Sequence, residues 1–393
     1  MIYVGIDIAS EKHDCCILGE HNKKLESFSF SNTRDGFISL LAACKKYAEP
    51  EQTKIGLEST GIYGDNLRDF LRRNGYEIHT FNPLLIKKSM QATTLRKTKT
   101  DKSDASFLAS YLARELPDPD PQISYHISEL KSLTRARFSV VGACSKATTQ
   151  LKALLVQVFP EFHTAFSDVF GVAAIAILRK YPTAKKLSAA KKTAVAKILS
   201  EASRHRLGEE KAAMLIDLAK NSVGCHSETK ALEMQYYLDQ IELNTAYIRR
   251  YEAAIREIMN EIDSPITTIP GIGLVLGAMI LAELGDVTRF AAPEKGLAFA
   301  GLDPSVYQSG KDTPASGPMV KRGSPKLRWA LLMAARSTIV HNPNIAIYYQ
   351  KKLSEGKHYN VICSHIAKKL VRILYSLLKK NTPYSLFYPQ ISA

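Results

Sequence analysis

Residues 117–121 read Pro-Asp-Pro-Asp-Pro, and this run divides the chain into two regions of different character. A proline inside a helix removes a backbone hydrogen bond and clashes with the preceding turn, so no helix is expected to continue through it. Before the run, short apolar segments alternate with helical patterns, and after it helical periodicity dominates as far as residue 262. We therefore expect an N-terminal domain over 1–120, a helical region over 121–262 and a third domain over 263–393.

The N-terminal region has the pattern of an α/β domain with a mixed sheet. Apolar runs rich in β-branched residues predict strands at 2–7, 15–18, 25–30, 54–58 and 76–81. A polar turn between the second and third strands indicates an antiparallel meander. Helices are predicted over 32–47, 64–74, from 83 onward and over 101–114.

The rest of the chain is predicted to be mainly α-helical. The longest helix is expected over 228–262, and its apolar residues recur at spacings of three, four and seven: Leu232, Tyr236, Leu243, Tyr247, Tyr251, Ile255, Ile258 and Ile262. This pattern fits a coiled coil that joins two copies, and it fits equally a helix packed within its own chain. Further helices are expected over 274–284, 326–341 and 361–380.

Positive charge is concentrated toward the C-terminus. The sequence has 53 Lys and Arg against 38 Asp and Glu, which gives a net charge of +15. Residues 311–380 hold fourteen Lys and Arg and two acids, whereas the remainder is nearly balanced. This excess favours polyanionic partners, nucleic acid above all, although anionic lipids and acidic proteins are compatible with it.

The sequence disfavours several classes of protein. Its six cysteines are scattered without a CxxC pair, so neither a zinc site nor a disulfide framework is indicated, and a reducing compartment fits them. No run of about 18 uncharged apolar residues occurs, so no membrane span is expected. The chain starts directly in a strand-like run, without the pattern of a signal peptide.

Four carboxylates are candidates for a metal site. Asp7 lies in an apolar strand, where a charge is costly unless it is paired or binds a metal. Glu58 ends the fourth strand, and Asp101 and Asp104 share one face of a helix because they are three residues apart. Four such oxygen ligands suit a pair of Mg²⁺ ions, which together assist phosphoryl transfer.

Each of these acids also has a structural alternative. An ion pair with a lysine would account for Asp7, and a cap at the end of the sheet would account for Glu58. Asp101 is also a candidate N-cap of its helix, and Asp104 alone fits a solvated helix charge. The nearby Asp14 is interpreted as a surface residue of a loop.

With these motifs the sequence resembles the DEDD-type transposases of the insertion-sequence one-ten/eleven-eleven group. The resemblance is carried by Gly5-Ile6-Asp7, by Leu57-Glu58-Ser59-Thr60-Gly61-Ile62-Tyr63 and by Lys99-Thr100-Asp101-Lys102-Ser103-Asp104-Ala105. It implies a RuvC-like N-terminal domain with the RNase H fold, in which Asp7, Glu58, Asp101 and Asp104 bind the metal ions. It covers both end domains, while the middle region is identified only as a helical linker with a coiled coil.

Two loops of the last domain have a function under this resemblance. Ile269-Pro270-Gly271-Ile272-Gly273 resembles the hairpin of helix-hairpin-helix modules, in which Gly271 and Gly273 would let the backbone approach a phosphate. A tight turn between packed helices is the alternative. Ser309, in Tyr-Gln-Ser-Gly, matches the catalytic serine of the family. From composition alone most Ser-Gly pairs are turns, and Ser305 is the rival nucleophile.

Two groups of cations are expected to bind nucleic acid. The group beside the carboxylates comprises Lys87, Lys88, Arg96, Lys97, Lys99 and Lys102, and the group before a C-terminal helix comprises Lys321, Arg322, Lys326 and Arg328. Cations of this kind neutralise phosphates and make binding sensitive to salt. A solvated basic helix face is the alternative for any one of them.

The resemblance implies a DNA recombinase that excises and inserts its own element by Mg²⁺-assisted attack of a serine on DNA phosphate. The implied partners are double-stranded DNA of the element ends and target, a structured non-coding guide RNA, and further copies of the chain in a homodimer or homotetramer. The expected location is the cytoplasm of a prokaryote, at the nucleoid. Two alternatives stay open: a Holliday-junction or structure-specific endonuclease using metal-activated water, and a non-enzymatic nucleic-acid-binding scaffold.

Overall fold

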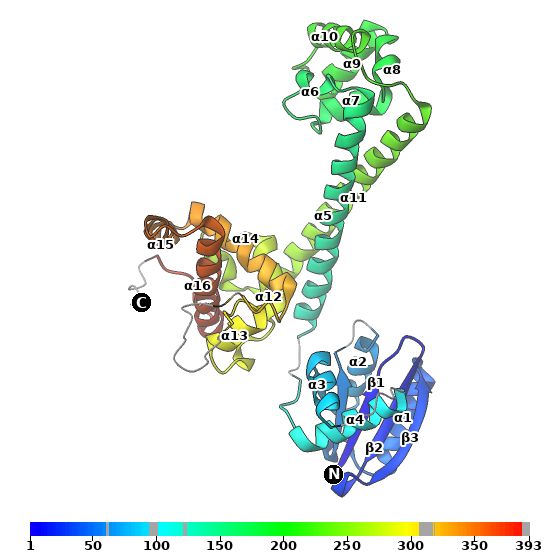
Figure 1. Ribbon diagram of the computed structural model, residues 1–393, viewed down its shortest axis with the longest axis vertical. Helices are drawn as coiled ribbons and strands as arrows, with labels where there is room; N and C mark the ends of the chain where they lie inside the picture. The colour runs from blue at the N-terminus through cyan, green and yellow to red at the C-terminus, as the bar shows by residue number, and fades with distance from the viewer. Residues whose placement is uncertain (60–62, 94–100, 121–123, 306–316, 318, 387–393) are drawn as a thin grey trace. The chain divides into compact units, whose positions relative to one another are not determined.

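The computed structural model describes residues 1–59, 63–93, 101–120, 124–305, 317 and 319–386 (Figure 1). The chain divides into two compact units, Met1–Gln122 and Ile123–Ala393. The division into three domains stays a prediction. Within the described residues, no helix has the length and apolar character needed to cross a membrane.

The first unit is built on a five-stranded mixed sheet, as the sequence predicts. Its strands are β1 (Ile2–Asp7), β2 (Lys12–Leu18), β3 (Lys24–Ser31), β4 (Thr53–Glu58) and β5 (Glu77–Phe81), in the spatial order β3-β2-β1-β4-β5. The first three strands form an antiparallel meander, whereas β4 is parallel to β1 and β5 is parallel to β4. The parallel strands therefore end at the same edge of the sheet.

Helices cover both faces of this sheet because its residues alternate between the two sides. The even-numbered apolar residues of β1 pack with Leu40 of α1 (Arg34–Lys45) and Leu67 of α2 (Asp65–Arg73). The opposite face packs against α4 (Asp101–Glu115), which in turn contacts α3 (Pro83–Thr93). Figure 1 shows α4 lying across the strands.

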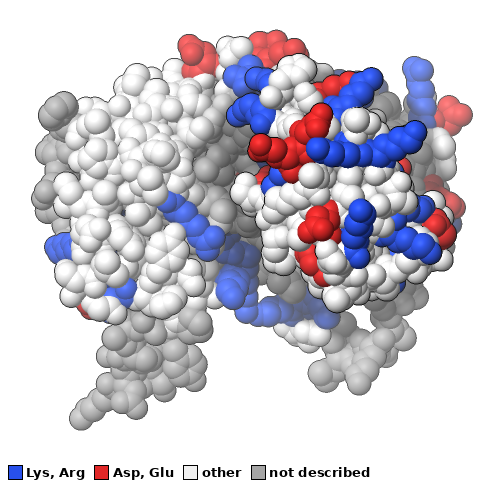
Figure 2. Space-filling model, turned by 90° about the horizontal axis from the view of Figure 1, so that it is seen from above, with Lys and Arg blue, Asp and Glu red and all other residues white. Residues whose placement is uncertain are grey.

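Two long helices form the axis of the second unit. These are α5 (Tyr125–Val158) and α11 (Glu228–Ile262), and they run antiparallel: Cys225 N, just before α11, donates to Gln157 O near the end of α5. Between them the chain forms a cap of small helices at one end of the pair: α6 (Phe162–Ala165), α7 (Val172–Lys180), α8 (Ala184–Ser188), α9 (Lys192–Ala202) and α10 (Glu209–Lys220). Figure 2 looks onto this cap, where basic and acidic side chains are mixed and several form ion pairs.

The apolar stripe predicted for 228–262 is wrong for its first half. The residues buried there are Ala231, Met234 and Leu238, while Leu232, Tyr236 and Leu243 are 73%, 55% and 58% exposed. The contact with α5 and the cap therefore uses a neighbouring face of the helix. The packing of α11 within its own chain is confirmed, and a row of exposed apolar side chains is left on its other side.

The C-terminal part of this unit is a helical domain at the other end of the pair. It comprises α12 (Leu274–Leu284), α13 (Pro293–Ala300), α14 (Pro325–His341), α15 (Pro343–Ser354) and α16 (Tyr359–Lys380), and Ile280, Ala334 and Leu370 meet in its core. The sequence reasoning missed α13 and α15, although each begins with a proline, which is favoured in the first turn of a helix. Short 3₁₀ turns occur at Glu20–Asn22, Pro50–Gln52, Pro265–Thr268 and Val287–Arg289.

Candidate active site

Two of the predicted carboxylates lie side by side at one edge of the sheet. Asp7 is the last residue of β1 and Glu58 is the last residue of β4. These strands are parallel neighbours, and their register pairs Ile6 with Leu57, so the residues that follow are level with each other. By the two-residue period of a strand, both side chains belong to the face that α4 covers.

A third carboxylate comes to the same edge from α4. Gly5 of β1 lies directly against this helix, because a Cβ atom there would overlap the carbonyl oxygen of Ala105 and the amide nitrogen of Ala109. The later residues Ser110 and Arg114 line a hollow with Met1, at the beginning of β1. The helix therefore runs opposite to β1, and its first turns, which contain Asp101 and Asp104, lie toward the end of that strand.

The donor chemistry at this edge suits a divalent cation, because carboxylate oxygens are the ligands that Mg²⁺ prefers. Among the side chains that the structure describes, however, no three from His, Cys, Asp and Glu are gathered closely enough to hold an ion. The side chain of Asp101 is not among those described. The backbone thus brings the acids to one edge, while the described side chains are not closed around an ion.

Asp14 is a further acid at this edge, and its interpretation as a loop residue is wrong. It lies in β2 directly opposite Asp7 in the antiparallel register, so the two side chains share a face. Ser29 Oγ donates a 2.6 Å hydrogen bond to Asp14 Oδ1. Like charges placed opposite each other on neighbouring strands destabilise a sheet. The sequence signal was the alternation of Asp14, Cys16 and Leu18, which starts the strand three residues earlier than predicted.

Part of the basic group beside the carboxylates is described. Lys87 and Lys88 are exposed on α3, where they are available to phosphates. The backbone of Lys102 lies in the first turn of α4, but its side chain is not described. Three further members lie outside the described residues: Arg96, Lys97 and Lys99.

The hairpin before α12 divides the roles of its two glycines. Gly271 has a φ of +94°, and a Cβ atom there would lie 2.9 Å from the backbone N and Cα of Thr338 in α14. Close packing of helices, the structural alternative, therefore accounts for Gly271. Gly273 is the N-cap of α12 and would meet no atom within 4 Å, which leaves the N-terminus of this helix open.

The predicted nucleophile Ser309 lies outside the described residues, but the two ends of its segment are described. Pro304 and Met319 form an isolated antiparallel bridge, and Val320 N donates to Asp303 O at 2.9 Å. The rival Ser305 lies just inside this bridge, where its hydroxyl is packed against Gly317. The segment that contains Ser309 thus leaves and re-enters the domain at one place.

The cations after this segment differ in their surroundings. Lys321 and Arg322 are exposed. Lys326 holds its ammonium 4.7 Å from the ring centroid of Phe138 in α5. Arg328 donates to the carbonyl oxygens of Ala300 and Lys321, at 3.3 and 3.2 Å, so its guanidinium holds the backbone before α14.

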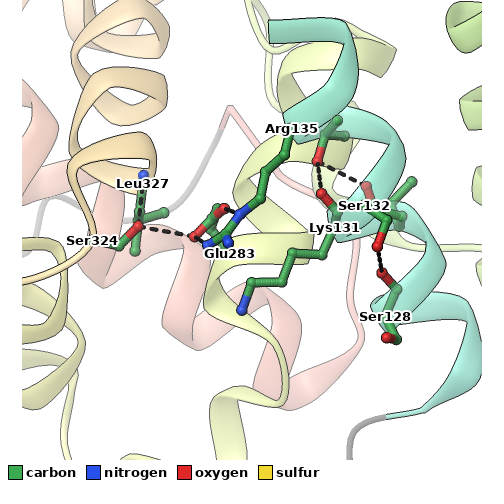
Figure 3. Close-up of polar contacts among 9 residues, drawn as sticks. Ser128, Lys131, Ser132, Arg135, Glu283, Ser324 and Leu327 are labelled. Atoms are coloured by element: carbon green, nitrogen blue, oxygen red, sulfur yellow. Dashed lines mark hydrogen bonds and ion pairs between the residues drawn. The ribbon is translucent and has the colours of Figure 1, made fainter. Parts of the chain in front are cut away.

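A buried acid ties three helices together beside these cations (Figure 3). Glu283 of α12 is 2% exposed, and it accepts hydrogen bonds of 2.6 and 3.0 Å from Arg135 of α5. Ser324 Oγ donates to Glu283 at 2.9 Å and accepts from Leu327 N, so it also caps α14. Burial raises the pKa of Glu283, but the bonds from Arg135 and Ser324 outweigh it and hold this pKa below its ordinary value. Sequence reasoning missed this site, whose signal was one acid in the most apolar helix.

The lowered pKa of Glu283 predicts a loss of stability in acid. The favourable bonds are fully present above the ordinary pKa of 4.5, and they are lost as the pH falls through the lower folded-state pKa. Glu283→Gln is expected to cost about 2 kcal/mol of unfolding free energy at pH 7, and the difference should shrink below about pH 4.5. Urea unfolding across this range measures it. Glu294→Gln, which breaks an exposed pair with Arg372, is the control, and a difference that does not change with pH would contradict the assignment.

Comparison with known proteins agrees with this arrangement of acids. A family model of DEDD transposases of the IS110 type matches residues 4–160, a range that includes all four predicted carboxylates. The transposase IS116/IS110/IS902 family matches residues 263–350, which include the segment of Ser309. The two matches together cover more than half of the chain. The chain belongs to the IS110 family of transposases.

Relatives of this transposase match nearly its whole length. An uncharacterized 44.8 kDa protein of insertion element IS116 from Streptomyces clavuligerus is 24% identical, over 96% of this chain and 94% of its own. A pilin gene-inverting protein from Moraxella lacunata is also 24% identical, over 97% of both chains. The transposase for element IS1111A from Coxiella burnetii is 28% identical over 42% of this chain and 47% of its own. The sheet unit is thus an RNase H-like DEDD domain, a type that typically uses divalent metal ions.

Proposed function

We propose that this transposase excises and inserts an insertion sequence by cutting DNA with Ser309 and rejoining it. The observation that carries the proposal is the meeting of Asp7, Glu58 and the first turns of α4 at one edge of the sheet. An edge of this kind supplies the negative charge needed to hold cations beside a phosphate. The match of the transposase family to the segment of Ser309 supports the serine.

In the proposed step Ser309 Oγ attacks a DNA phosphorus atom. A new O–P bond forms while the bond from phosphorus to one deoxyribose oxygen breaks. The serine proton passes to solvent, and the departing oxygen takes up a proton and becomes a free hydroxyl end. The number of phosphoester bonds is unchanged, so attack by a hydroxyl of another strand can reverse the step and release the serine without an external source of energy.

Asp7, Glu58, Asp101 and Asp104 would hold two Mg²⁺ ions. Bound there, the ions polarise the phosphate and stabilise charge on the attacking and leaving oxygens. The chain's own contribution is to fix the ends of β1 and β4 and the start of α4 at one edge, so that small side-chain rotations complete the site. Asp101 supplies the donor whose side chain the structure does not describe.

The proposal includes double-stranded DNA, a structured guide RNA and a second copy of the chain as partners. Lys87 and Lys88 beside the acids, and Lys321 and Arg322 after the serine segment, are exposed cations that suit phosphates. The row of exposed apolar residues on α11 suits contact with another copy. The guide RNA rests on the resemblance of the sequence motifs alone.

The test is a search for DNA that is covalently bound to protein. Wild-type protein is incubated with Mg²⁺, labelled element-end DNA and RNA transcribed from the element, and the mixture is then denatured. We expect an adduct that is lost in Ser309→Ala and kept in Ser305→Ala, the matched control. Cleavage that persists in Ser309→Ala would contradict the serine and favour metal-activated water. Tight binding without any cleavage by the wild type would favour a scaffold.

A further inference from the structure

Trp329, the only tryptophan of the chain, lies on the surface of α14. Its side chain is 40% exposed, although a ring of this size is usually well buried. Its ring meets Phe138 of α5 edge to face, with centroids 4.9 Å apart and an angle of 79° between the planes. Trp329 and Phe138 therefore form an aromatic pair across two helices, and part of the tryptophan remains open to solvent.

Cations surround this aromatic pair. Lys326 lies one turn before Trp329, and its ammonium is over the ring of Phe138. Arg135 lies one turn before Phe138, with its side chain 45% exposed, and its partner Glu283 is buried and already neutralised. The exposed Lys321 and Arg322 precede the same helix. A flat apolar ring bordered by positive charge is complementary to a nucleobase flanked by phosphates.

We propose that Trp329 stacks on an unpaired base of single-stranded DNA, with Phe138 fixing its ring and Lys326 and Arg322 binding the neighbouring phosphates. The inference rests on the proposed function and adds to it a place for an unpaired strand. Bases in a duplex already stack on one another, so their faces are available only where the strands are separated. We assign DNA because the segment closed by Pro304 and Met319, which carries the proposed nucleophile toward DNA, joins this helix directly.

Because the chain has one tryptophan, its fluorescence reports on this site in the full-length wild-type protein. Titration with a thymidine oligomer of about 12 nucleotides, which spans a typical single-strand site, is expected to quench the emission and shield Trp329 from acrylamide. The same sequence as a duplex should bind with little quenching. Emission that stays unchanged while the anisotropy of a labelled oligomer shows saturation would overturn the proposal. A Ser309-dependent adduct in that case would leave the proposed function standing.

Variants give a second measurement. Trp329→Ala is expected to weaken binding of the oligomer by about 5- to 100-fold, as for the loss of one stacked base, while Trp329→Phe keeps most of the affinity. Tyr125→Ala removes another exposed aromatic of α5 and is the control. Two results would overturn the assignment. One is a uridine RNA oligomer that quenches more strongly than DNA, and the other is quenching by protein concentration alone, which would make a second copy the partner. If Trp329→Ala does not fold, the wild-type titration decides alone.

Discussion

Replacing Asp7 or Asp104 by asparagine is expected to reduce DNA strand cleavage by about a thousandfold or more. Asparagine keeps the shape of the side chain but removes the negative charge that would hold a cation at the ends of β1 and β4. Asp7 also faces Asp14 across two strands, so its neutralisation relieves a repulsion. The unfolding free energy should therefore stay the same or rise slightly, while DNA binding is kept.

Cleavage of labelled DNA, urea unfolding and the rise of Tm on addition of Mg²⁺ test this prediction together. A ligand that binds only the folded state stabilises it, so each variant should show a smaller rise than the wild type. Asp69→Asn on the exposed side of α2 removes an equal charge away from the edge and is the control. Full cleavage by both variants would show that the acids at this edge do not form the metal site.

Gly5→Ala is expected to destabilise the first unit by about 3 kcal/mol, which is large for the addition of one methyl group. The new Cβ would overlap backbone atoms of Ala105 and Ala109, and neither can move unless the whole of α4 shifts away from the sheet. Such a shift also withdraws Asp104 from the ends of β1 and β4. Cleavage should therefore fall even under conditions in which the variant is folded.

The matched control is Gly19→Ala, at the end of β2. A Cβ there would lie 3.2 Å from the tip of the Leu25 side chain, which can rotate aside, so the change in stability should be small. Urea unfolding of both variants measures the difference. Equal stability of Gly5→Ala and the wild type would mean that α4 does not lie against β1 at this position.

The sequence was most informative where local pattern and tertiary environment agree. The strands of the first unit follow from their β-branched apolar runs, and the helix 228–262 ends where it was predicted to end. The predicted stripe on that helix failed because its period is compatible with more than one face, and only the positions of α5 and the cap select Ala231, Met234 and Leu238. Asp14 was missed because its face depends on the register between β1 and β2, which the sequence does not contain.

The candidate site was predictable only in part for a similar reason. Asp7 and Glu58 follow from charged residues at the ends of apolar strands, a signal present in each strand by itself. The bond between Glu283 and Arg135 joins residues far apart in the chain, so neither residue alone predicts its partner. The packing role of Gly271 against Thr338 likewise appears only when α12 and α14 are placed together.

The joint of Glu283, Arg135 and Ser324 has a mechanical consequence because α5 continues without a break from Arg135 to Val158. At a rise of 1.5 Å per residue, this part of the helix is a lever about 35 Å long. A rotation of about 5° at the joint would move its far end by about 3 Å, roughly the rise of two helical residues. The stiffness of one buried acid and its two donors therefore governs how far the cap of α6–α10 swings relative to α12 and α14.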